Sequence, residues 1–132
     1  MKGTILAVDD DPDIIDALAV ILETKGYEVV AAQNGAEGLA RMRRGRPDLI
    51  ILDLLMPKMD GFEFRKEMER HEFRGIPILI LTSLREEAVR RRYELDTGSV
   101  LEADDYIEKP IIPDILLRKV DRIMSLASPS LN

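Results

Sequence analysis

The sequence has 132 residues, of which 45% are hydrophobic and 33% charged, with eight Gly and seven Pro, and this composition suits one globular domain rather than a disordered or fibrous chain. Because the chain has no Cys, disulfides, thiol nucleophiles and thiolate metal sites are excluded, and the cytoplasm is the expected compartment. A net charge of −6 argues against direct nucleic-acid binding, and no apolar run is long enough to cross a membrane.

Short apolar runs alternate with amphipathic stretches along the whole chain, and each pair has the pattern of a strand followed by a helix. The expected strands cover residues 4–8, 27–32, 48–53, 76–81 and 106–107. The expected helices cover residues 12–25, 35–44, a segment that begins at 60 or 61, 85–95 and 113–126. The third strand is almost wholly aliphatic, which indicates a strand covered by helices on both faces.

Particular residue types indicate where the helices begin and which faces they bury. Asp11 is the expected N-cap of the first helix, with Pro12 in its first turn, and Thr82 or Ser83 is the expected cap of the fourth. The expected core-facing side chains are Ile14, Leu18, Ile21 and Leu22 in the first helix, Phe62, Phe64 and Met68 in the third, and Ile115, Leu116, Val120, Ile123 and Met124 in the last.

Five strand–helix units with right-handed crossovers predict an α/β fold of the flavodoxin-like, doubly wound (βα)5 type, with a parallel sheet in the strand order 2-1-3-4-5. One domain is expected over residues 1–127, and residues 128–132 have the composition of a tail or the start of a linker. In such a sheet, ligands bind at the carboxyl ends of the strands, near the point where the strand order reverses.

Polar residues follow the expected strands at that edge of the sheet. Asp9 and Asp10 follow the first strand, Asp53 ends the third, Thr82 follows the fourth and Lys109 follows the fifth. Carboxylates that lie close together repel one another unless they are protonated or neutralised, so this arrangement favours a hard divalent cation. Mg²⁺ is the expected ion, since it prefers oxygen ligands and leaves room for a phosphoryl oxygen.

These motifs, in this order, resemble those of the receiver domain of two-component response regulators. The resemblance extends from about residue 4 to residue 126. The motifs are Asp9 and Asp10, Asp53 with Met56, Pro57, Asp60 and Gly61, then Thr82 and Ser83, then Asp104 and Asp105, and finally Lys109 with Pro110.

The resemblance implies that Asp53 is a phosphoacceptor, which takes a phosphoryl group from a sensor histidine kinase or a histidine phosphotransfer protein. It implies that Asp10, Asp53 and the main-chain carbonyl of Leu55 bind Mg²⁺, with Asp9 acting directly or through water. The chain would then be a signalling protein rather than an enzyme, since it would catalyse only its own phosphorylation and dephosphorylation.

The resemblance also implies roles for three further residues. Lys109 would pair with one phosphoryl oxygen, and the Thr82 hydroxyl would donate a hydrogen bond to another. Tyr106 would be the switch aromatic that turns inward as Thr82 moves, although ordinary packing on the strand is an equal alternative for this ring. The peptide bond between Lys109 and Pro110 is expected to be cis.

Two other functions compete with this interpretation. A phosphohydrolase of the haloacid dehalogenase type would use the Asp-x-Asp of residues 9–11, with Thr82 and Lys109. Its final acidic pair should follow the Lys, however, and the pair in this sequence precedes it; this alternative also leaves Asp53 without a role. A degenerate interaction module without phosphorylation is the second alternative, and the intact set of site residues argues against it.

The sequence departs from the usual receiver pattern between Thr82 and Lys109, where it is longer. Residues 95–103 are expected to form a lengthened or irregular connection, with Glu102 where receivers usually have Gly. Few residues follow Leu126, so we expect either a stand-alone receiver that acts on a downstream protein or part of a longer regulator with an output domain. No contact with a membrane is expected.

Overall fold

The computed structural model describes residues 2–54, 61–70, 72–98 and 103–127. The strands are β1 (Gly3–Val8), β2 (Tyr27–Ala32), β3 (Leu49–Asp53), β4 (Ile78–Thr82) and β5 (Asp105–Glu108). The helices are α1 (Pro12–Glu23), α2 (Gly35–Arg44), α3 (Gly61–Arg70), α4 (Leu84–Thr97) and α5 (Pro113–Ala127). Each strand and helix expected from the sequence is therefore present.

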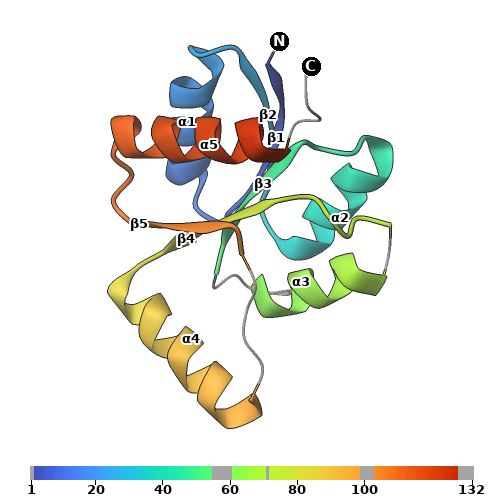
Figure 1. The fold of residues 1–132 in the computed structure, drawn as a ribbon, viewed down its shortest axis with the longest axis vertical. Coiled ribbons are helices and arrows are strands. Elements are labelled where there is room, and N and C mark those ends of the chain that lie inside the picture. The colour runs from blue at the N-terminus through green and yellow to red at the C-terminus, as the bar shows by residue number, and fades with distance from the viewer. Residues whose placement is uncertain (1, 55–60, 71, 99–102, 128–132) are drawn as a thin grey trace.

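The strands form one parallel sheet in the order β2-β1-β3-β4-β5, which confirms the predicted doubly wound topology (Figure 1). Helices α1 and α5 cover one face, and α2 and α3 cover the other. Alternate residues of β1 serve the two faces: Ile5 and Ala7 pack with α1 and α5, whereas Leu6 and Val8 pack with α2 and α3. Every residue of β3 and β4 is buried, as their position in the middle of the sheet requires.

Most of the predicted core side chains are buried or partly buried, but Ile115 was wrongly assigned to the core. Leu116, Val120 and Ile123 are buried, whereas Ile115 is 38% exposed. The buried positions are spaced by four and three residues and define one face of α5. Ile115 precedes Leu116 by one residue and is therefore rotated by about 100° away from that face.

Several element ends also differ from the prediction, most of them by one residue and one end each of α1, β4 and α4 by two. Helix α1 ends at Glu23 rather than at residue 25, because the chain turns there and Gly26 adopts a φ of 94°. Strand β4 begins at Ile78 rather than at residue 76. Its first N–H group donates a hydrogen bond of 2.8 Å to Asp104 Oδ2, so a side chain satisfies the backbone where the strand begins.

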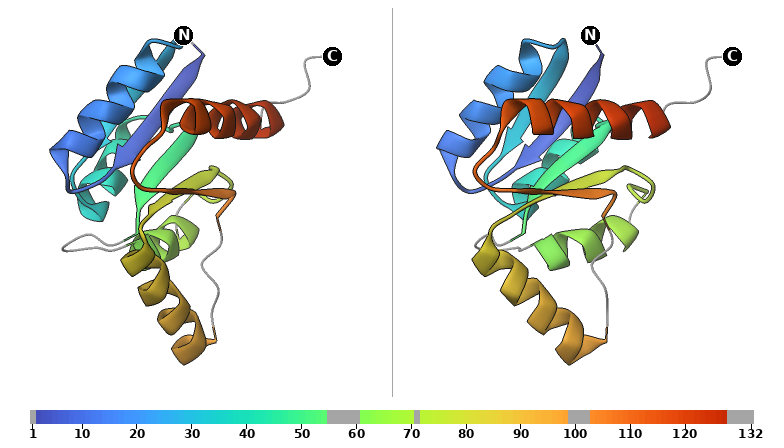
Figure 2. Two further views of the ribbon diagram at one scale, coloured as in Figure 1. Left: turned by 90° about the vertical axis from the view of Figure 1, so that its left-hand side faces the viewer. Right: turned by 60° about the vertical axis from the view of Figure 1, so that its left-hand side comes forward.

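Helix α4 is longer than predicted and takes up part of the extra length before β5. It runs to Thr97 rather than to residue 95, and Gly98 ends it with a φ of 69°, a conformation that favours glycine. Of the expected irregular segment, residues 99–102, including Glu102, lie outside the described residues. None of the residues of α4 is buried, and Figures 1 and 2 show this helix leading away from the sheet.

Among the residues that the structure describes, no helix is both long enough and apolar enough to span a bilayer.

The close packing of α2 against the sheet can be tested at Gly38. A Cβ at this position would lie 3.0 Å from Phe64 Cε1 and 3.2 Å from Val8 Cγ2, and both of these side chains are buried. Although Ala is the better helix former, we expect Gly38→Ala to lower the free energy of unfolding by roughly 1 kcal/mol, because the overpacking outweighs the gain in helix propensity. Urea denaturation measures the effect.

Gly45→Ala is the matched control, since a Cβ there has no atom within 4 Å and the backbone is extended. We expect this variant to stay within about 0.5 kcal/mol of the wild type. A Gly38→Ala protein as stable as the control would contradict the tight α2 packing.

Candidate functional site

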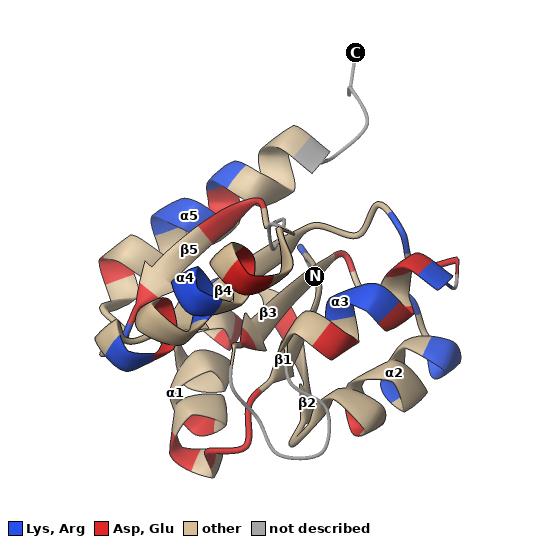
Figure 3. Ribbon diagram, turned by 90° about the horizontal axis from the view of Figure 1, so that it is seen from below, with Lys and Arg blue, Asp and Glu red and all other residues tan. Residues whose placement is uncertain are grey.

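The strand register brings the predicted site residues to one edge of the sheet. Val8 of β1 lies beside Leu52 of β3, so the acids that follow Val8 are level with Asp53. Asp53 pairs in turn with Leu81 of β4, whose next residue is Thr82. Strands β2 and β3 lie on opposite sides of β1, so the strand order reverses between β1 and β3. The carboxyl ends of these two strands are therefore the expected place for a ligand. Figure 3 looks onto this edge and shows acidic residues near the ends of β1 and β3.

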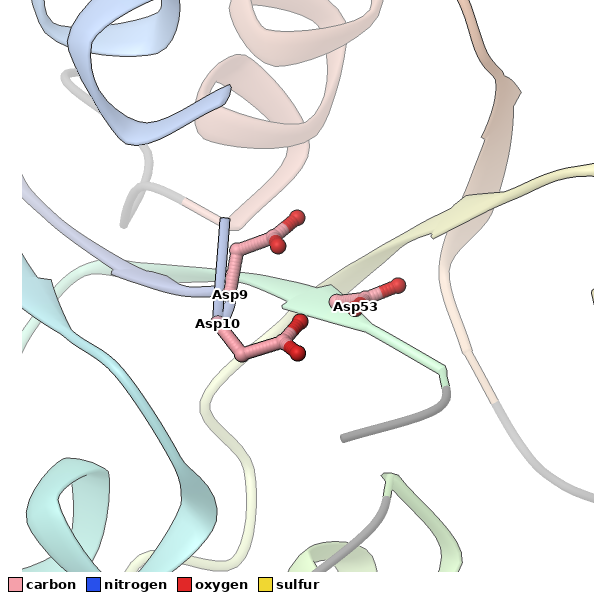
Figure 4. Close-up of side chains that lie close together, drawn as sticks. All are labelled: Asp9, Asp10 and Asp53. Carbon is pink, nitrogen blue, oxygen red and sulfur yellow. The ribbon is translucent and has the colours of Figure 1, made fainter. Parts of the chain in front are cut away.

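Three carboxylates form the centre of the site, as the sequence predicted. Asp9, Asp10 and Asp53 each offer an oxygen atom, and these atoms lie within 4.8 Å of one another (Figure 4). Asp9 and Asp53 are 1% and 2% exposed, whereas Asp10 lies on the surface. The group is therefore buried on one side and open to solvent on the other.

Lys109 supplies the positive charge of the site. Its Nζ lies 3.1 Å from Asp53 Oδ1 and 3.7 Å from Asp9 Oδ2. The backbone N–H of Lys109 donates a hydrogen bond of 2.7 Å to the Thr82 carbonyl, which ties the start of the next loop to the end of β4. The peptide bond that follows Lys109 is cis, as expected.

Burial and crowding raise the pKa values of two of the acids. Burial, together with the negative charge of Glu86, raises the pKa of Asp53 to about 7, although Lys109 opposes the shift. Burial also raises the pKa of Asp9 to about 6, against a hydrogen bond of 2.9 Å that the Asp11 backbone N–H donates to Asp9 Oδ1. One lysine is therefore too little positive charge to keep these carboxylates at their ordinary pKa.

The donor set fits a hard divalent cation. All three candidate ligands are carboxylate oxygens, and Asp9 Oδ2 is buried without a hydrogen bond from the described part of the chain. A buried carboxylate oxygen without a donor is costly, and a cation would satisfy it. The exposed side of Asp10 leaves space for the water ligands that Mg²⁺ retains. Leu55, whose carbonyl was predicted to contribute, lies outside the described residues.

The sequence left open whether Thr82 or Ser83 caps α4, and the structure assigns the cap to Ser83. Ser83 is the N-cap of α4, and its Oγ accepts a hydrogen bond of 3.2 Å from the Glu86 backbone N–H. Thr82 is 4% exposed, and its hydroxyl donates a hydrogen bond of 3.2 Å to the Ser83 carbonyl. Ser83 rather than Thr82 is therefore the N-cap of α4, and Thr82 ends β4 at the carboxyl edge of the sheet.

Tyr106 lies between the core and α4. Its ring is half-buried and packs against the core that α2 and α3 cover, and the Arg90 guanidinium lies 5.1 Å from the ring centroid. Arg90 also makes ion pairs of 2.5 Å with Glu87 and 3.1 Å with Glu94, so it connects the ring to two acids of α4.

Sequence reasoning missed one residue of the site, Glu86. Its side chain is only 12% exposed, and its Oε1 lies 3.6 Å from Lys109 Nζ. The sequence signal at this position is the Ser-x-x-Glu pattern of residues 83–86, which predicts a helix-capping role instead. Only the placement of α4 beside the site reveals this fourth acid.

Comparison with known proteins shows the family to which the chain belongs. The family model described as the response regulator receiver domain matches residues 5–121. The chain belongs to this family. As a receiver domain it is a signalling module of two-component response regulators rather than a metabolic enzyme.

The receiver domain is similar in sequence to part of several bacterial regulators. It is 38% identical to the alkaline phosphatase synthesis transcriptional regulatory protein PhoP of Bacillus subtilis over 133 aligned residues, which cover 98% of this chain and 53% of PhoP. It is 39% identical to the DNA-binding dual master transcriptional regulator RpaA of Synechocystis, with 96% of this chain and 54% of RpaA covered. The chain thus spans about half the length of the curated relatives it matches.

Solved structures show the same fold. The signal receiver domain of a histidine kinase from Syntrophus aciditrophicus is 36% identical, with a TM-score of 0.79 and coverage of 98% of this chain and 97% of that one. The chemotaxis protein CheY4 of Vibrio cholerae is 33% identical, with a TM-score of 0.75 and coverage of 92% and 98%. Receiver domains of this kind work with histidine kinases and with output domains.

The raised pKa values predict how stability depends on pH. Asp9 and Asp53 have folded pKa values of about 6 and about 7, above the ordinary value of 3.8, so the folded chain binds more protons than the unfolded chain between these limits. Without divalent cations, their contribution to stability is therefore present below about pH 4 and lost as the pH rises to about 7. Added Mg²⁺ should restore stability at pH 8 and have little effect at pH 4.5, where the carboxylates are protonated.

Thermal and urea unfolding at several pH values, in EDTA and in Mg²⁺, measure this behaviour. At pH 8 in EDTA, Asp53→Asn should be more stable than the wild type by on the order of 1–3 kcal/mol, because it removes one crowded charge. Asp13→Asn, which removes an exposed carboxylate from α1, is the control and should change little. If Asp53→Asn were no more stable than this control, the electrostatic account of the site would be wrong.

Proposed function

We propose that Asp53 is the phosphoacceptor of this receiver domain and that it takes its phosphoryl group from a histidine of a sensor kinase or a phosphotransfer protein. The observation that carries this proposal is the contact of 3.1 Å between Lys109 Nζ and Asp53 Oδ1, beside the carboxylates of Asp9 and Asp10. A carboxylate held between an ammonium group and a cation-binding acid pair is suited to attack a phosphorus atom and to tolerate the charge that it gains.

The transfer makes one bond and breaks one bond. An Asp53 carboxylate oxygen bonds to phosphorus, the bond between phosphorus and the histidine nitrogen breaks, and its electron pair stays on that nitrogen. Lys109 Nζ, which already lies beside Asp53, would form an ion pair with a phosphoryl oxygen after the transfer. Asp53 must be unprotonated to attack, so its raised pKa makes the neutralising groups around it important.

We propose Mg²⁺ as the cofactor, held by Asp10 and Asp53, with Asp9 bound directly or through water and the Leu55 carbonyl as a further ligand. When bound, the ion would neutralise the carboxylates and the charge of the transferring group. Asp9 Oδ2, which accepts no hydrogen bond from the described residues, and the carboxylate oxygens within 4.8 Å of one another support this choice.

Thr82 and Tyr106 are the proposed switch residues. The Thr82 hydroxyl would leave the Ser83 carbonyl and donate its hydrogen bond to a phosphoryl oxygen. The half-buried Tyr106 ring would then turn further toward the core that it already contacts. Phosphorylation would in this way shift the population of two surface arrangements rather than create a new surface.

The proposed domain covers residues 1–127, with residues 128–132 as a tail or linker. We propose a cytoplasmic location and an output through a downstream protein or an output domain, without DNA contact by this segment. The names of the relatives, transcriptional regulators of about twice this length, support a separate output domain. Nothing in the site or the comparisons favours a haloacid-dehalogenase-type phosphohydrolase or a degenerate module.

Phosphorylation by a small phosphodonor tests the proposed chemistry. We expect the wild-type chain to gain one phosphoryl group when incubated with acetyl phosphate and Mg²⁺, as measured by intact-mass spectrometry. Asp53→Asn should gain none, and Asp13→Asn should react like the wild type, since that carboxylate lies on the exposed face of α1. An adduct on Asp53→Asn, or none on the wild type, would exclude this function.

The switch proposal is tested separately by Thr82→Val, which removes the buried hydroxyl but keeps the shape of the side chain. We expect this variant to be phosphorylated, while the NMR signals of the Tyr106 ring shift by much less than in the phosphorylated wild type. Equal shifts in the two proteins would show that the ring responds without Thr82.

A further inference from the structure

Glu86 occupies an unusual position for an acid in the first turn of a helix. Ser83 caps α4 and accepts a hydrogen bond from the Glu86 backbone N–H, which is half of a capping box. In the other half of that motif, the Glu side chain would accept a hydrogen bond from the Ser83 backbone N–H. The described part of the chain contains no such bond, and the carboxylate is directed to Lys109 instead.

The Glu86 carboxylate is poorly satisfied where it lies. Its Oε1 is 3.6 Å from Lys109 Nζ, which exceeds hydrogen-bonding distance, and its Oε2 is buried without a hydrogen bond from any described residue. The same ammonium group is closer to Asp53, at 3.1 Å, and also faces Asp9, at 3.7 Å. Three carboxylates therefore share one cation, and the Glu86 carboxylate also lies against that of Asp53, whose pKa it raises.

We propose that Glu86 is a displaceable counterion of Lys109. In the unphosphorylated protein, the Glu86 carboxylate holds the Lys109 ammonium group, and it is expelled when a phosphoryl group on Asp53 binds that ammonium group instead. This inference rests on the proposed phosphorylation of Asp53. A phosphoryl group carries negative charge and strong acceptor oxygens, so it would compete for Lys109 and repel the Glu86 carboxylate. Glu86 is then a positioning residue, since it acts on the reaction through Lys109.

The loose attachment of α4 makes this displacement cheap. None of its residues is buried, and Figure 2 shows its far end clear of the sheet. The remaining contacts of α4 with the body of the domain include the Tyr93 ring, 3.9 Å from that of Phe62, and Arg90 over Tyr106. Release of Glu86 would free the first turn of α4, which begins two residues after Thr82, and would carry the signal to the Arg90 and Tyr106 contact.

Glu86→Gln tests the proposal, because it removes the charge but keeps the shape and the backbone hydrogen bond to Ser83. The probe is beryllofluoride, a mimic of the phosphoryl group, titrated at saturating Mg²⁺ into the 132-residue chain. We expect Glu86→Gln to bind the probe roughly 3- to 10-fold more tightly than the wild type, because one carboxylate fewer competes for Lys109 and no charge at position 86 repels the probe. Glu69→Gln removes an exposed acid of α3 and should bind as the wild type does.

A second measurement monitors the contact itself, without any phosphoryl mimic. In the free protein, Glu86→Gln should shift the NMR signals of the Lys109 Nζ group and of the first turn of α4, whereas Glu69→Gln should leave them in place. If Glu86→Gln does not fold, as judged by circular dichroism, Glu86→Asp replaces it, since the shorter side chain withdraws the carboxylate from Lys109.

The outcomes separate this inference from the proposed function. Affinity for beryllofluoride that is unchanged or weaker in Glu86→Gln, with the wild type binding normally, would overturn the role of Glu86 alone. Failure of the wild type to bind beryllofluoride or to be phosphorylated would instead overturn the proposed role of Asp53. Unshifted Lys109 signals in Glu86→Gln would show that the carboxylate does not hold the ammonium group.

Discussion

The ammonium group of Lys109 is shared by carboxylates that come from three different parts of the chain. Asp9 follows β1, Asp53 ends β3 and Glu86 belongs to the first turn of α4, and each lies within 3.7 Å of Lys109 Nζ. The negative charges outnumber the positive charge, so the pKa values of Asp9 and Asp53 are raised. The proposed Mg²⁺ site and the proposed reactivity of Asp53 both depend on this one imbalance.

The distribution of packing explains how such an imbalance is tolerated. The residues of β3 and β4 are buried, and the two apolar cores on either side of the sheet hold the strands in a fixed register. Helix α4 buries none of its residues. Charge repulsion at the site therefore acts against a rigid sheet on one side and a weakly packed helix on the other, and the helix is the element that can yield.

The fold and most of the site could be predicted because their signals are local. The alternation of apolar runs and amphipathic stretches located every element, and the acids after β1 and at the end of β3 indicated the carboxyl edge of the sheet. The burial of Ile115 was misjudged because an apolar residue beside the core-facing side of a helix cannot be distinguished, by residue type alone, from one on that side. Glu86 was missed because its local sequence pattern is that of a helix-capping residue, and this role explains the residue without any contact to a distant part of the chain.

The sequence by itself determined the element order, the strand topology and the candidate site residues at the strand ends, because periodicity and strand-end chemistry depend on neighbouring positions. Only the tertiary structure decided which carboxylates share Lys109, which hydroxyl caps α4 and which faces that helix leaves exposed. Those properties depend on the distance between segments far apart in the chain, such as the 23 positions that separate Glu86 from Lys109, and packing alone sets that distance.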